Sequence, residues 1–285
     1  MKAMRNRKNT LIFGLGVLGL ILAYMLFRGV THSLFNSSLT RINIGIWGKH
    51  SYVVSLGKTT KQNYIFLFPN SYEVQVPGGL KGYKIGALGK LADLEKDPQL
   101  FAKAMGQGSG VFIHKYIHEQ KSEIYDDDAW IDSIKFVEIK REIERSLFQQ
   151  GDLSLFDRLY VYSAIRDARP SQTTLVRVKE SKPELLLYDK VFRNEKKLVQ
   201  MMYTDSERTA YFIAQMLENS GIRVADIAKS TTLLPNCTII DSGKTFSQTS
   251  KFISSYFACD LEKGDTGLYE IQWILDHGVE KRWKL

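Results

Sequence analysis

Ile42-Asn-Ile-Gly-Ile-Trp47 is the first of three short segments that are rich in β-branched and aromatic residues. Tyr52-Val-Val-Ser-Leu56 and Tyr64-Ile-Phe-Leu-Phe68 follow it, and Gly, Lys, Thr and Asn residues separate the three. Segments of this composition, bounded by turn-forming residues, are typical of β-strands. The sequence therefore predicts a sheet at the centre of a domain that begins near residue 39.

Apolar residues at helical spacing follow these strands. Leucines recur at 88, 91 and 94, which places them on one face of a helix. The further expected elements are a strand over 72–76, helices over 100–106, 130–149 and 156–165, and a strand over 174–178. Strands and helices both contribute, which predicts an α/β domain with a central mixed sheet over residues 39–185.

Residues 195–285 form a second unit with its own order of elements. The expected strands cover 198–203, 222–227, 238–240 and 271–275, and the expected helices are one capped by Asp205 or Ser206 and one over 246–257. This order predicts a smaller βαββαβ domain. We place the boundary between the two domains between Pro183 and Glu195.

The first 28 residues predict a membrane anchor. Four basic residues precede an uncharged run over 10–27, and Arg28 closes it. As a helix the run would rise about 27 Å, close to the hydrocarbon thickness of a bilayer. Because basic residues favour the cytoplasmic side, we expect a single-pass protein of the cell membrane, with a cytoplasmic N-terminus and an extracytoplasmic remainder from Gly29 onward. A cleaved secretory signal is the alternative, and it would leave the domains in the same compartment.

The net charge of +8 arises mainly in this leader. Residues 1–28 hold five Lys and Arg and no acidic residue, whereas the remaining 257 residues hold 34 basic and 31 acidic residues. A net charge of +3 over these 257 residues does not provide the basic surface that nucleic-acid-binding proteins use. We therefore expect no nucleic-acid partner.

Cys237 and Cys259 are the only cysteines of the chain. In an exported domain they can form a disulfide, and closing this loop would stabilise the fold by about 3 kcal/mol. The alternative is two buried free thiols, which behave as small hydrophobic side chains. Two isolated cysteines do not make a metal site. His114 and His118 lie in a β-rich segment without the Glu of the zinc-protease motif, so we expect no metal ligands there either.

Two parts of the chain resemble the LytR-CpsA-Psr (LCP) cell-envelope family. The middle resembles the LCP domain in the segments Ile42-Asn-Ile-Gly-Ile-Trp-Gly48, Tyr52-Val-Val-Ser-Leu56, Phe66-Leu-Phe-Pro-Asn-Ser-Tyr-Glu-Val-Gln-Val-Pro-Gly78 and Tyr83-Lys-Ile-Gly86. The last part resembles the LytR C-terminal domain in the segments Val199-Gln-Met-Met-Tyr203, Thr204-Asp-Ser206 and Asn219-Ser-Gly-Ile-Arg-Val224. The order of elements is similar from about residue 39 to residue 178, and the N-terminal anchor is also similar.

The resemblance implies an activity from which this chain departs. Catalytic LCP proteins move an anionic glycopolymer from a polyprenyl-pyrophosphate carrier to peptidoglycan, with carboxylates that hold Mg²⁺ and arginines that neutralise the pyrophosphate. Their strand before the tight turn ends in Ile-Pro-Arg-Asp-Thr, whereas here Pro69 is followed by Asn70 and Ser71. Neutral side chains do not replace those charges. We therefore expect no catalytic residues, no metal site and no cofactor.

The resulting prediction is a non-catalytic binding or assembly module in the maintenance of cell-wall or surface polymers. Its expected partners are the membrane and a polyprenyl-linked or cell-wall glycopolymer, and the sequence assigns no oligomeric state. The alternative is a divergent phosphotransferase that uses Mg²⁺ and takes Arg158, Arg166 and Arg169 as phosphate contacts. That alternative requires the three arginines to converge beside Asn70. The simpler interpretation is that they are solvated charges at helix ends.

Overall fold

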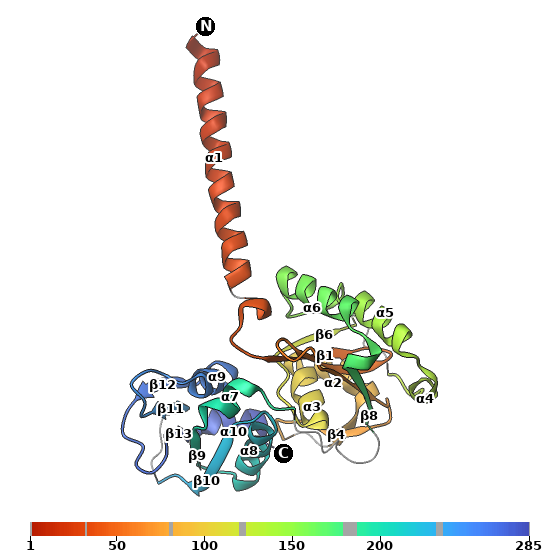
Figure 1. The fold of residues 1–285 in the computed structure, drawn as a ribbon, viewed down its shortest axis with the longest axis vertical. Helices are drawn as coiled ribbons and strands as arrows, with labels where there is room; N and C mark the ends of the chain where they lie inside the picture. Colours follow the sequence, from red (N-terminus) through yellow and green to blue (C-terminus); the bar gives the residue numbers. More distant parts are fainter. Residues whose placement is uncertain are drawn as a thin grey trace.

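The structure is a computed structural model that describes residues 2–31, 33–79, 82–119, 124–178, 187–231 and 236–284. Helix α1 (Lys2–Thr31) extends away from two α/β domains that lie side by side (Figure 1). A short 3₁₀ turn, η1 (Leu34–Asn36), follows α1 and leads into the first domain. The two domains carry all of the sheets that the described residues form.

The predicted membrane anchor requires a correction. Crossing a bilayer as a helix takes about 20 consecutive, mostly apolar residues. Among the residues given above, no helix combines sufficient length with sufficient apolarity to cross a membrane. The expected N-terminal transmembrane helix is therefore wrong.

The first domain is built on a six-stranded mixed sheet with the strand order β7-β6-β1-β2-β3-β8. Its strands are β1 (Arg41–Trp47), β2 (Ser51–Gly57), β3 (Asn63–Phe68), β6 (Lys115–His118), β7 (Gln150–Gly151) and β8 (Thr173–Arg177). Strand β2 is antiparallel to β1 and β3, whereas β6 is parallel to β1 and β8 is parallel to β3. Strands β1, β3, β6 and β8 therefore end at one edge of the sheet, which we call the carboxyl edge, and begin at the opposite, amino edge.

Helices cover both faces of this sheet (Figure 1). They are α5 (Phe136–Ser146) and α6 (Leu155–Asp167) on one face, and α2 (Leu88–Glu95) and α3 (Gln99–Ser109) on the other. Ile44 and Ile46 of β1 pack with the first pair of helices, while Trp47 packs with the second pair. Because both faces are covered, β1 and β2 are buried along almost their whole length.

The helix predicted over 130–149 is divided in two. The observed elements are α4 (Trp130–Ser133) and α5, which begins at Phe136. Ile134 and Lys135 between them have extended backbone conformations. The backbone N–H of Lys135 donates to the Glu138 carboxylate at 3.0 Å. Glu138 thus satisfies a backbone donor at the start of α5 and fixes where that helix begins.

Short elements complete the first domain. They are the hairpin of β4 (Glu73–Gln75) and β5 (Gly82–Lys84), the 3₁₀ turn η2 (Ile85–Ala87) and the 3₁₀ turn η3 (Pro170–Gln172) before β8. The hairpin follows the end of β3. Its residue Val74 is buried in the core beside α2 and α3.

The second domain has a five-stranded sheet with the order β10-β9-β13-β11-β12. Its elements are α7 (Lys190–Glu195), β9 (Leu198–Tyr203), α8 (Glu207–Asn219), β10 (Arg223–Lys229), β11 (Thr238–Asp241), α9 (Gln248–Phe257), β12 (Asp260–Lys263), β13 (Ile271–Ile274) and α10 (His277–Trp283). The predicted βαββαβ order therefore lacks helix α7, strand β12 and helix α10. Strand β12 is a polar edge strand, and α10 buries few apolar residues, among them Val279 and Trp283.

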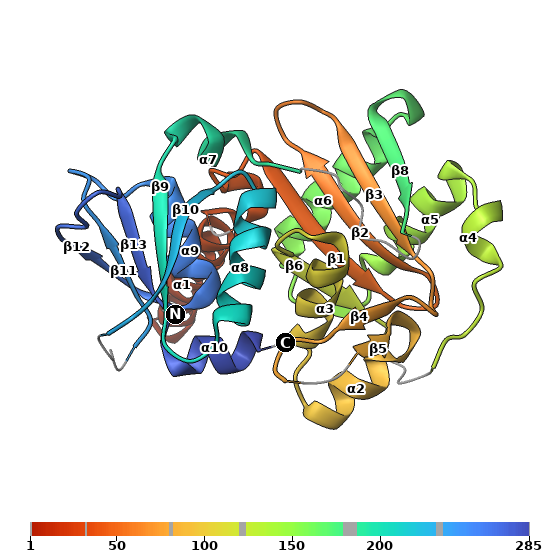
Figure 2. The same cartoon turned by 90° about the horizontal axis from the view of Figure 1, so that it is seen from below.

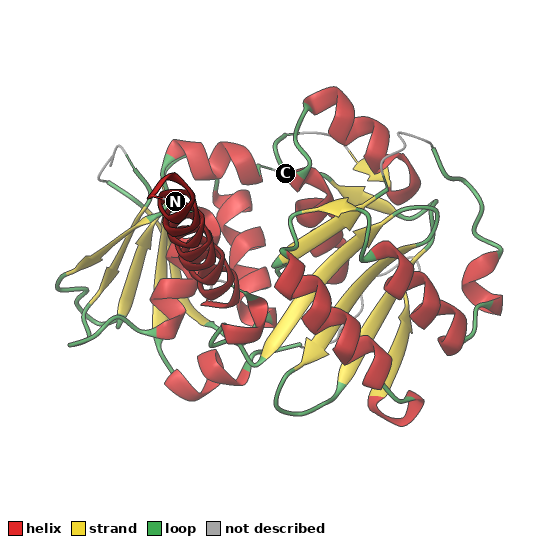
Figure 3. Ribbon diagram, turned by 90° about the horizontal axis from the view of Figure 1, so that it is seen from above, coloured by secondary structure: helices red, strands yellow, loops and turns green. Residues whose placement is uncertain are grey.

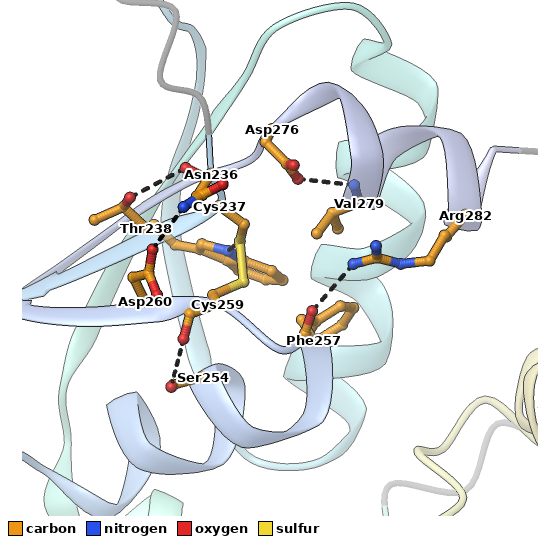
Figure 4. The surroundings of a disulfide bond; sticks show 11 residues. Asn236, Cys237, Thr238, Ser254, Phe257, Cys259, Asp260, Asp276, Val279 and Arg282 are labelled. Carbon is orange, nitrogen blue, oxygen red and sulfur yellow. Dashed lines mark hydrogen bonds between the residues drawn. A yellow bond between two sulfur atoms is a disulfide. The ribbon is translucent and has the colours of Figure 1, made fainter.

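A disulfide joins Cys237 and Cys259, whose Cα atoms are 4.7 Å apart (Figure 4). The two cysteines directly precede β11 and β12, which are parallel neighbours in the sheet. Trp273 of β13 places its indole Nε1 3.1 Å from the sulfur of Cys237. The disulfide therefore fixes the starts of two adjacent strands against the core of the second domain.

The two domains are joined by hydrogen bonds and by a shared apolar cluster. Figure 2 shows α8 and α9 on the side of the second sheet that faces the first domain, and Figure 3 shows helices between the two sheets. Phe112 of the first domain packs at 4.8 Å from the Tyr256 ring of α9, measured between ring centroids. Asp189 accepts hydrogen bonds from the backbone N–H groups of Thr40 and Arg41, at 2.7 and 3.0 Å. These contacts link residues near the end of the domain connection to the start of β1.

Two further hydrogen-bonded contacts cross between the domains. The side-chain amide of Asn219 donates to the carbonyl of Gly110 at 2.9 Å. The backbone N–H groups of Gly78 and Gly79 donate to the carbonyl of Lys284 at 2.8 and 2.9 Å. Both glycines have positive φ angles, which a residue with a Cβ adopts only at a steric cost. The turn is thus shaped to receive the end of α10.

Candidate functional site

The carboxyl edge contains the position at which the family resemblance places catalytic charges. Pro69 follows β3 and cannot donate a ladder hydrogen bond, and the Tyr72 N–H closes a turn onto its carbonyl at 3.1 Å. Asn70 lies in this turn and is only 1% exposed. Ser71, the next residue, is exposed. The local sequence therefore turns the chain sharply and directs Asn70 into the protein.

Asn70 connects three loops of the first domain. Its side-chain amide donates to the carbonyls of Lys49, at 3.1 Å, and Asp127, at 2.9 Å. Its backbone N–H makes a short hydrogen bond to the Asp128 carboxylate. Its backbone carbonyl accepts from the Gly86 N–H at 2.9 Å. The side-chain N–H donors of Asn70 are therefore committed to interactions inside the protein, whereas its Oδ1 is buried without a hydrogen-bond partner among the described residues.

The charge at this position is unfavourable for a pyrophosphate. Asp128 also accepts a hydrogen bond from the backbone N–H of Ser71 at 3.3 Å, so its carboxylate occupies the turn after β3. The described residues contain no group of three or more His, Cys, Asp or Glu side chains that could hold a metal ion. The residues around Asn70 therefore do not fit the Mg²⁺ of the catalytic LCP proteins, and we derive no chemical step through it.

A second polar cluster lies close by, after β1. The carboxylate of Glu142 in α5 is 2.8 Å from Nδ1 of His50 and accepts a short hydrogen bond from the hydroxyl of Tyr52. The His50 ring stacks on Trp130 with 4.2 Å between centroids. Nothing in the sequence pairs Glu142 with His50, because 92 residues separate them.

The electrostatics of this cluster favour an ionised Glu142. Burial by itself raises the pKa of its carboxyl group, but the hydrogen bonds from His50 and Tyr52 outweigh this and lower the pKa overall. Burial and the neighbouring carboxylate raise the pKa of Tyr52, which keeps its hydroxyl protonated as a donor. The cluster is a polar network that attaches α4 and α5 to the sheet, and the buried indole Nε1 of Trp130 beside it has no hydrogen-bond partner among the described residues.

The three arginines considered as phosphate contacts are dispersed. Arg158 lies in α6 and donates to the carbonyls of Gln149, at 2.8 Å, and Leu153, at 3.2 Å, with a further short hydrogen bond to Leu147. Arg166 and Arg169 are exposed. Arg169 precedes β8, whose first residue pairs with the first residue of β3. It therefore lies at the amino edge, while Asn70 lies at the carboxyl edge, roughly one strand length of about 20 Å away. The structure does not bring these residues together.

A groove lies between the domains, beside the start of β6. The Asn70 turn lies at the opposite, carboxyl edge of the sheet. It has a volume of about 650 Å³. Its walls come from α3, the start of β6, α9 and α10, and the lining includes Lys103, Lys115, Tyr116, Tyr256, Arg282 and Trp283. No sequence pattern predicted this groove, because its wall from α3 and β6 and its wall from α9 and α10 are more than 100 residues apart in the chain.

A second pocket, of about 810 Å³, lies between α8 and β10 of the second domain and the first domain. Its polar lining includes Gln75, Gln107, Arg208, Glu218 and Asp226. Acidic side chains outnumber basic ones in this lining, whereas basic side chains outnumber acidic ones in the groove.

Comparison with proteins of known structure concerns about half of the chain. TagT from Bacillus subtilis has 11% sequence identity over 48% of this chain and 78% of its own, with a TM-score of 0.34. The LytR-CPS2A-psr family protein YwtF (TagT), solved with octaprenyl pyrophosphate lipid, has 10% identity over 48% and 77%, with a TM-score of 0.33. About half of this chain is similar to LCP proteins. TagV from B. subtilis gives 10% identity over 50% and 85%, with a TM-score of 0.34.

With TM-scores of 0.33–0.34, these similarities to solved structures carry no conclusion about this chain. The sequence identity is 9–11%, and the chemistry has to follow from the residues of this chain. No protein-family model matches the chain, and no curated protein matches it significantly. None of these comparisons shows the LytR C-terminal domain, which stays a prediction.

Proposed function

We propose that this protein is a non-catalytic binding or assembly module for a cell-envelope glycopolymer and that it acts outside the cytoplasm. The observation that supports the non-catalytic role is the state of Asn70. It is 1% exposed and its amide is occupied by two carbonyls of the protein. Asn70 is neutral and does not supply the charge that a pyrophosphate or its metal requires in a poorly solvated site.

The charge balance of the turn supports the same proposal. A pyrophosphate carries several negative charges and requires cations in a poorly solvated site. Here the carboxylate of Asp128 lies against the backbone of Asn70 and Ser71. Bringing a pyrophosphate to this carboxylate would add like-charge repulsion, which is costly where water is excluded.

The disulfide supports the location. Disulfides form and persist in oxidising compartments and are rare in the cytosol. The bond between Cys237 and Cys259 is therefore the expected state of an exported domain. This argument does not depend on how the protein is held at the cell surface.

The divergent phosphotransferase is the competing function. It needs a set of cations beside the Asn70 turn, and the three arginines do not supply it. Arg158 is bound to three backbone carbonyls, and Arg169 lies at the opposite edge of the sheet. No observation of this structure favours that function over the binding module.

The experiment offers the full chain a polyprenyl-pyrophosphate-linked glycan, purified peptidoglycan and Mg²⁺, and measures both transfer and binding. A catalytic LCP protein under the same conditions is the positive control. We expect retention of the glycopolymer on the protein without transfer above the rate of a protein-free sample. Transfer by this chain would overturn the non-catalytic role, and failure to retain any wall glycopolymer would overturn the binding module.

A further inference from the structure

The groove between the domains has the size and the position of a ligand site. Its volume of about 650 Å³ lies in the range of small-molecule pockets, which occur preferentially at domain interfaces. Leu39 and Phe252 contribute to its apolar lining. The hydrogen bonds between Asp189 and Thr40, and between Asn219 and Gly110, hold the two domains in place without any ligand. The groove is therefore formed in the free protein.

Its charged lining is predominantly positive. Lys103, Lys115 and Arg282 line the groove, and Asp152 is the single acidic side chain among its lining residues. Burial lowers the pKa of His114, also in the lining, to about 4, so that this side chain is neutral at pH 7. The two lysines come from the first domain and Arg282 from the second, so the cations lie on both walls.

The cations retain capacity for a ligand. The ammonium of Lys115 donates to the backbone carbonyl of Asp152 at 3.2 Å and lies 3.7 Å from its carboxylate, and both side chains are about one-third exposed, so that one of the three N–H donors of Lys115 is left over. The guanidinium of Arg282 donates to the carbonyl of Phe257 at 3.2 Å. A guanidinium has five N–H donors in a planar fork that fits a phosphate or carboxylate group. Lys103, by contrast, is held at 3.2 Å from Asp97.

Aromatic rings line the same groove. Tyr116 comes from the first domain and Tyr256 from the second, and both are half-buried, whereas Trp283 of the second domain is only 5% exposed and lies behind Tyr256. The Tyr256 and Trp283 rings lie 6.1 Å apart between centroids, with 41° between their planes. Rigid aromatic side chains with a polar end offer a large contact area at low entropic cost. The C–H face of a pyranose ring packs well on such surfaces.

We propose that this groove binds an anionic glycan, with a sugar ring on the aromatic wall and its negatively charged substituent between Lys115 and Arg282. The inference deepens the proposed function and rests on it, because it states where a glycopolymer is held and which of its groups are recognised. The site is separate from the Asn70 turn. Its recognition of charge uses side chains of both domains.

The test measures the binding of three small probes to the full chain by calorimetry. N-acetylglucosamine 1-phosphate carries the sugar and the charge, glucuronic acid carries a carboxylate in place of the phosphate, and N-acetylglucosamine is neutral. We expect the two anionic probes to bind at least about tenfold more tightly than the neutral sugar, which corresponds to about 1.4 kcal/mol. We also expect their affinity to fall with added salt, as ionic contacts near the surface are screened.

Variants locate the site. Arg282→Ala and Lys115→Ala should each weaken N-acetylglucosamine 1-phosphate about tenfold and change the affinity for N-acetylglucosamine little, whereas Arg282→Lys should retain part of the affinity. Lys281→Ala is the matched control, because Lys281 is the exposed neighbour of Arg282 in α10 and does not line the groove. Circular dichroism and unfolding curves confirm that each variant is folded.

The outcomes separate this inference from the proposed function. If the chain retains wall glycopolymer and the Arg282 and Lys115 variants bind it as well as the parent protein does, the groove is not the site and the binding module stands. If the neutral sugar binds as tightly as its phosphate, the recognition of charge is overturned. If the chain binds neither the glycopolymer nor the probes, both proposals fail together.

Discussion

The turn around Asn70 and the groove between the domains both contain polar and charged groups, but these groups bind one another at the turn and line an open volume in the groove. At the turn, loops of the first domain meet and their polar groups bind one another, so that Asn70 is occupied by the carbonyls of Lys49 and Asp127. At the groove, elements of two domains meet and leave a volume of about 650 Å³ lined by cations and aromatic rings. The comparison teaches that loops whose polar groups bind one another leave little for a ligand to contact, whereas the junction of two domains leaves a lined volume.

The largest effect that we expect concerns the occupied turn. Asn70→Asp would remove the amide donor and place a carboxylate against two backbone carbonyls and beside Asp128. An uncompensated buried charge of this kind costs about 3–5 kcal/mol. Chemical denaturation at pH 7 should therefore show a loss of that size in the free energy of unfolding.

Ser71→Ala is the control for this prediction. Ser71 is exposed, and its hydrogen bonds to Asp128 come from its backbone N–H, so its unfolding free energy should stay within about 0.5 kcal/mol of the parent value. An Asn70→Asp protein of parental stability would show that the turn is not occupied in the way the hydrogen bonds indicate. The comparison with the groove would then be lost.

The next largest effect concerns the disulfide beside the α9 wall of the groove. Phe257 and Ala258, which line it, directly precede Cys259 of the disulfide. Replacing both cysteines by serine opens a loop with a sequence separation of 22 residues, which should lower the free energy of unfolding by about 3 kcal/mol in the chain-entropy model. Thermal unfolding of the double variant, compared with the parent protein before and after reduction, measures this.

Reduction should not affect the double variant, because no disulfide remains to be broken. We also expect weaker binding of N-acetylglucosamine 1-phosphate to the double variant, since the α9 wall is less well fixed. A parent protein that is equally stable in reduced and oxidised form would contradict the stabilising role of the bond.

The groove should also respond to acid through His114. Its Nδ1 accepts a hydrogen bond from the backbone N–H of Asn43 at 2.9 Å, and burial lowers its pKa from 6.5 to about 4. The unfolded chain therefore takes up the proton first. The stability that neutral His114 contributes is present in full above about pH 6.5 and is lost as pH falls toward 4, with about 2 kcal/mol lost by pH 5.

Urea unfolding of the parent protein and of His114→Gln between pH 7 and pH 5 measures this contribution. The decrease over that interval should be smaller in the variant by about 2 kcal/mol. Identical pH profiles for the two proteins would show that His114 is accessible to protons in the folded state, and the neutral charge assigned to it in the groove would be wrong.

The smallest expected effect lies beside the turn, at Glu142. Its lowered pKa means that its contribution to stability is present above about pH 4.5 and is lost as pH falls through the folded value. Its side chain is one-third exposed, so solvent screens the interaction, and Glu142→Gln should cost only about 1 kcal/mol at pH 7. Glu144→Gln, on the same helix, should cost less. Equal effects of the two substitutions would show that the His50 and Tyr52 contacts contribute nothing.

Much of the fold follows from local patterns in the sequence. The predicted strands around Ile44, Val54 and Phe66 are confirmed. Short, apolar segments that are rich in β-branched residues and bounded by turn residues form few regular structures other than strands. The helix of the second domain that Ser206 caps begins where expected, since the Ser206 hydroxyl accepts from the Thr209 N–H. The α/β class follows from such elements.

The features that could not be predicted depend on distant contacts. The break at Lys135 is set by a carboxylate three residues on, within a segment whose apolar spacing fits a continuous helix. Strand β12 is polar and exists because it pairs with β11, and the pairing of His50 with Glu142 spans 92 residues. The departure at Asn70 is visible in the sequence, but the hydrogen bonds that occupy it are not.

The contact of the Lys284 carbonyl with Gly78 and Gly79 has a kinetic consequence. Together with the contacts at Asp189 and Asn219 it fixes the angle between the domains at three separate points. A ligand that enters from solvent does not have to wait for a hinge to open or close. Its capture should follow a single exponential whose rate rises in proportion to ligand concentration, with no plateau set by a conformational step.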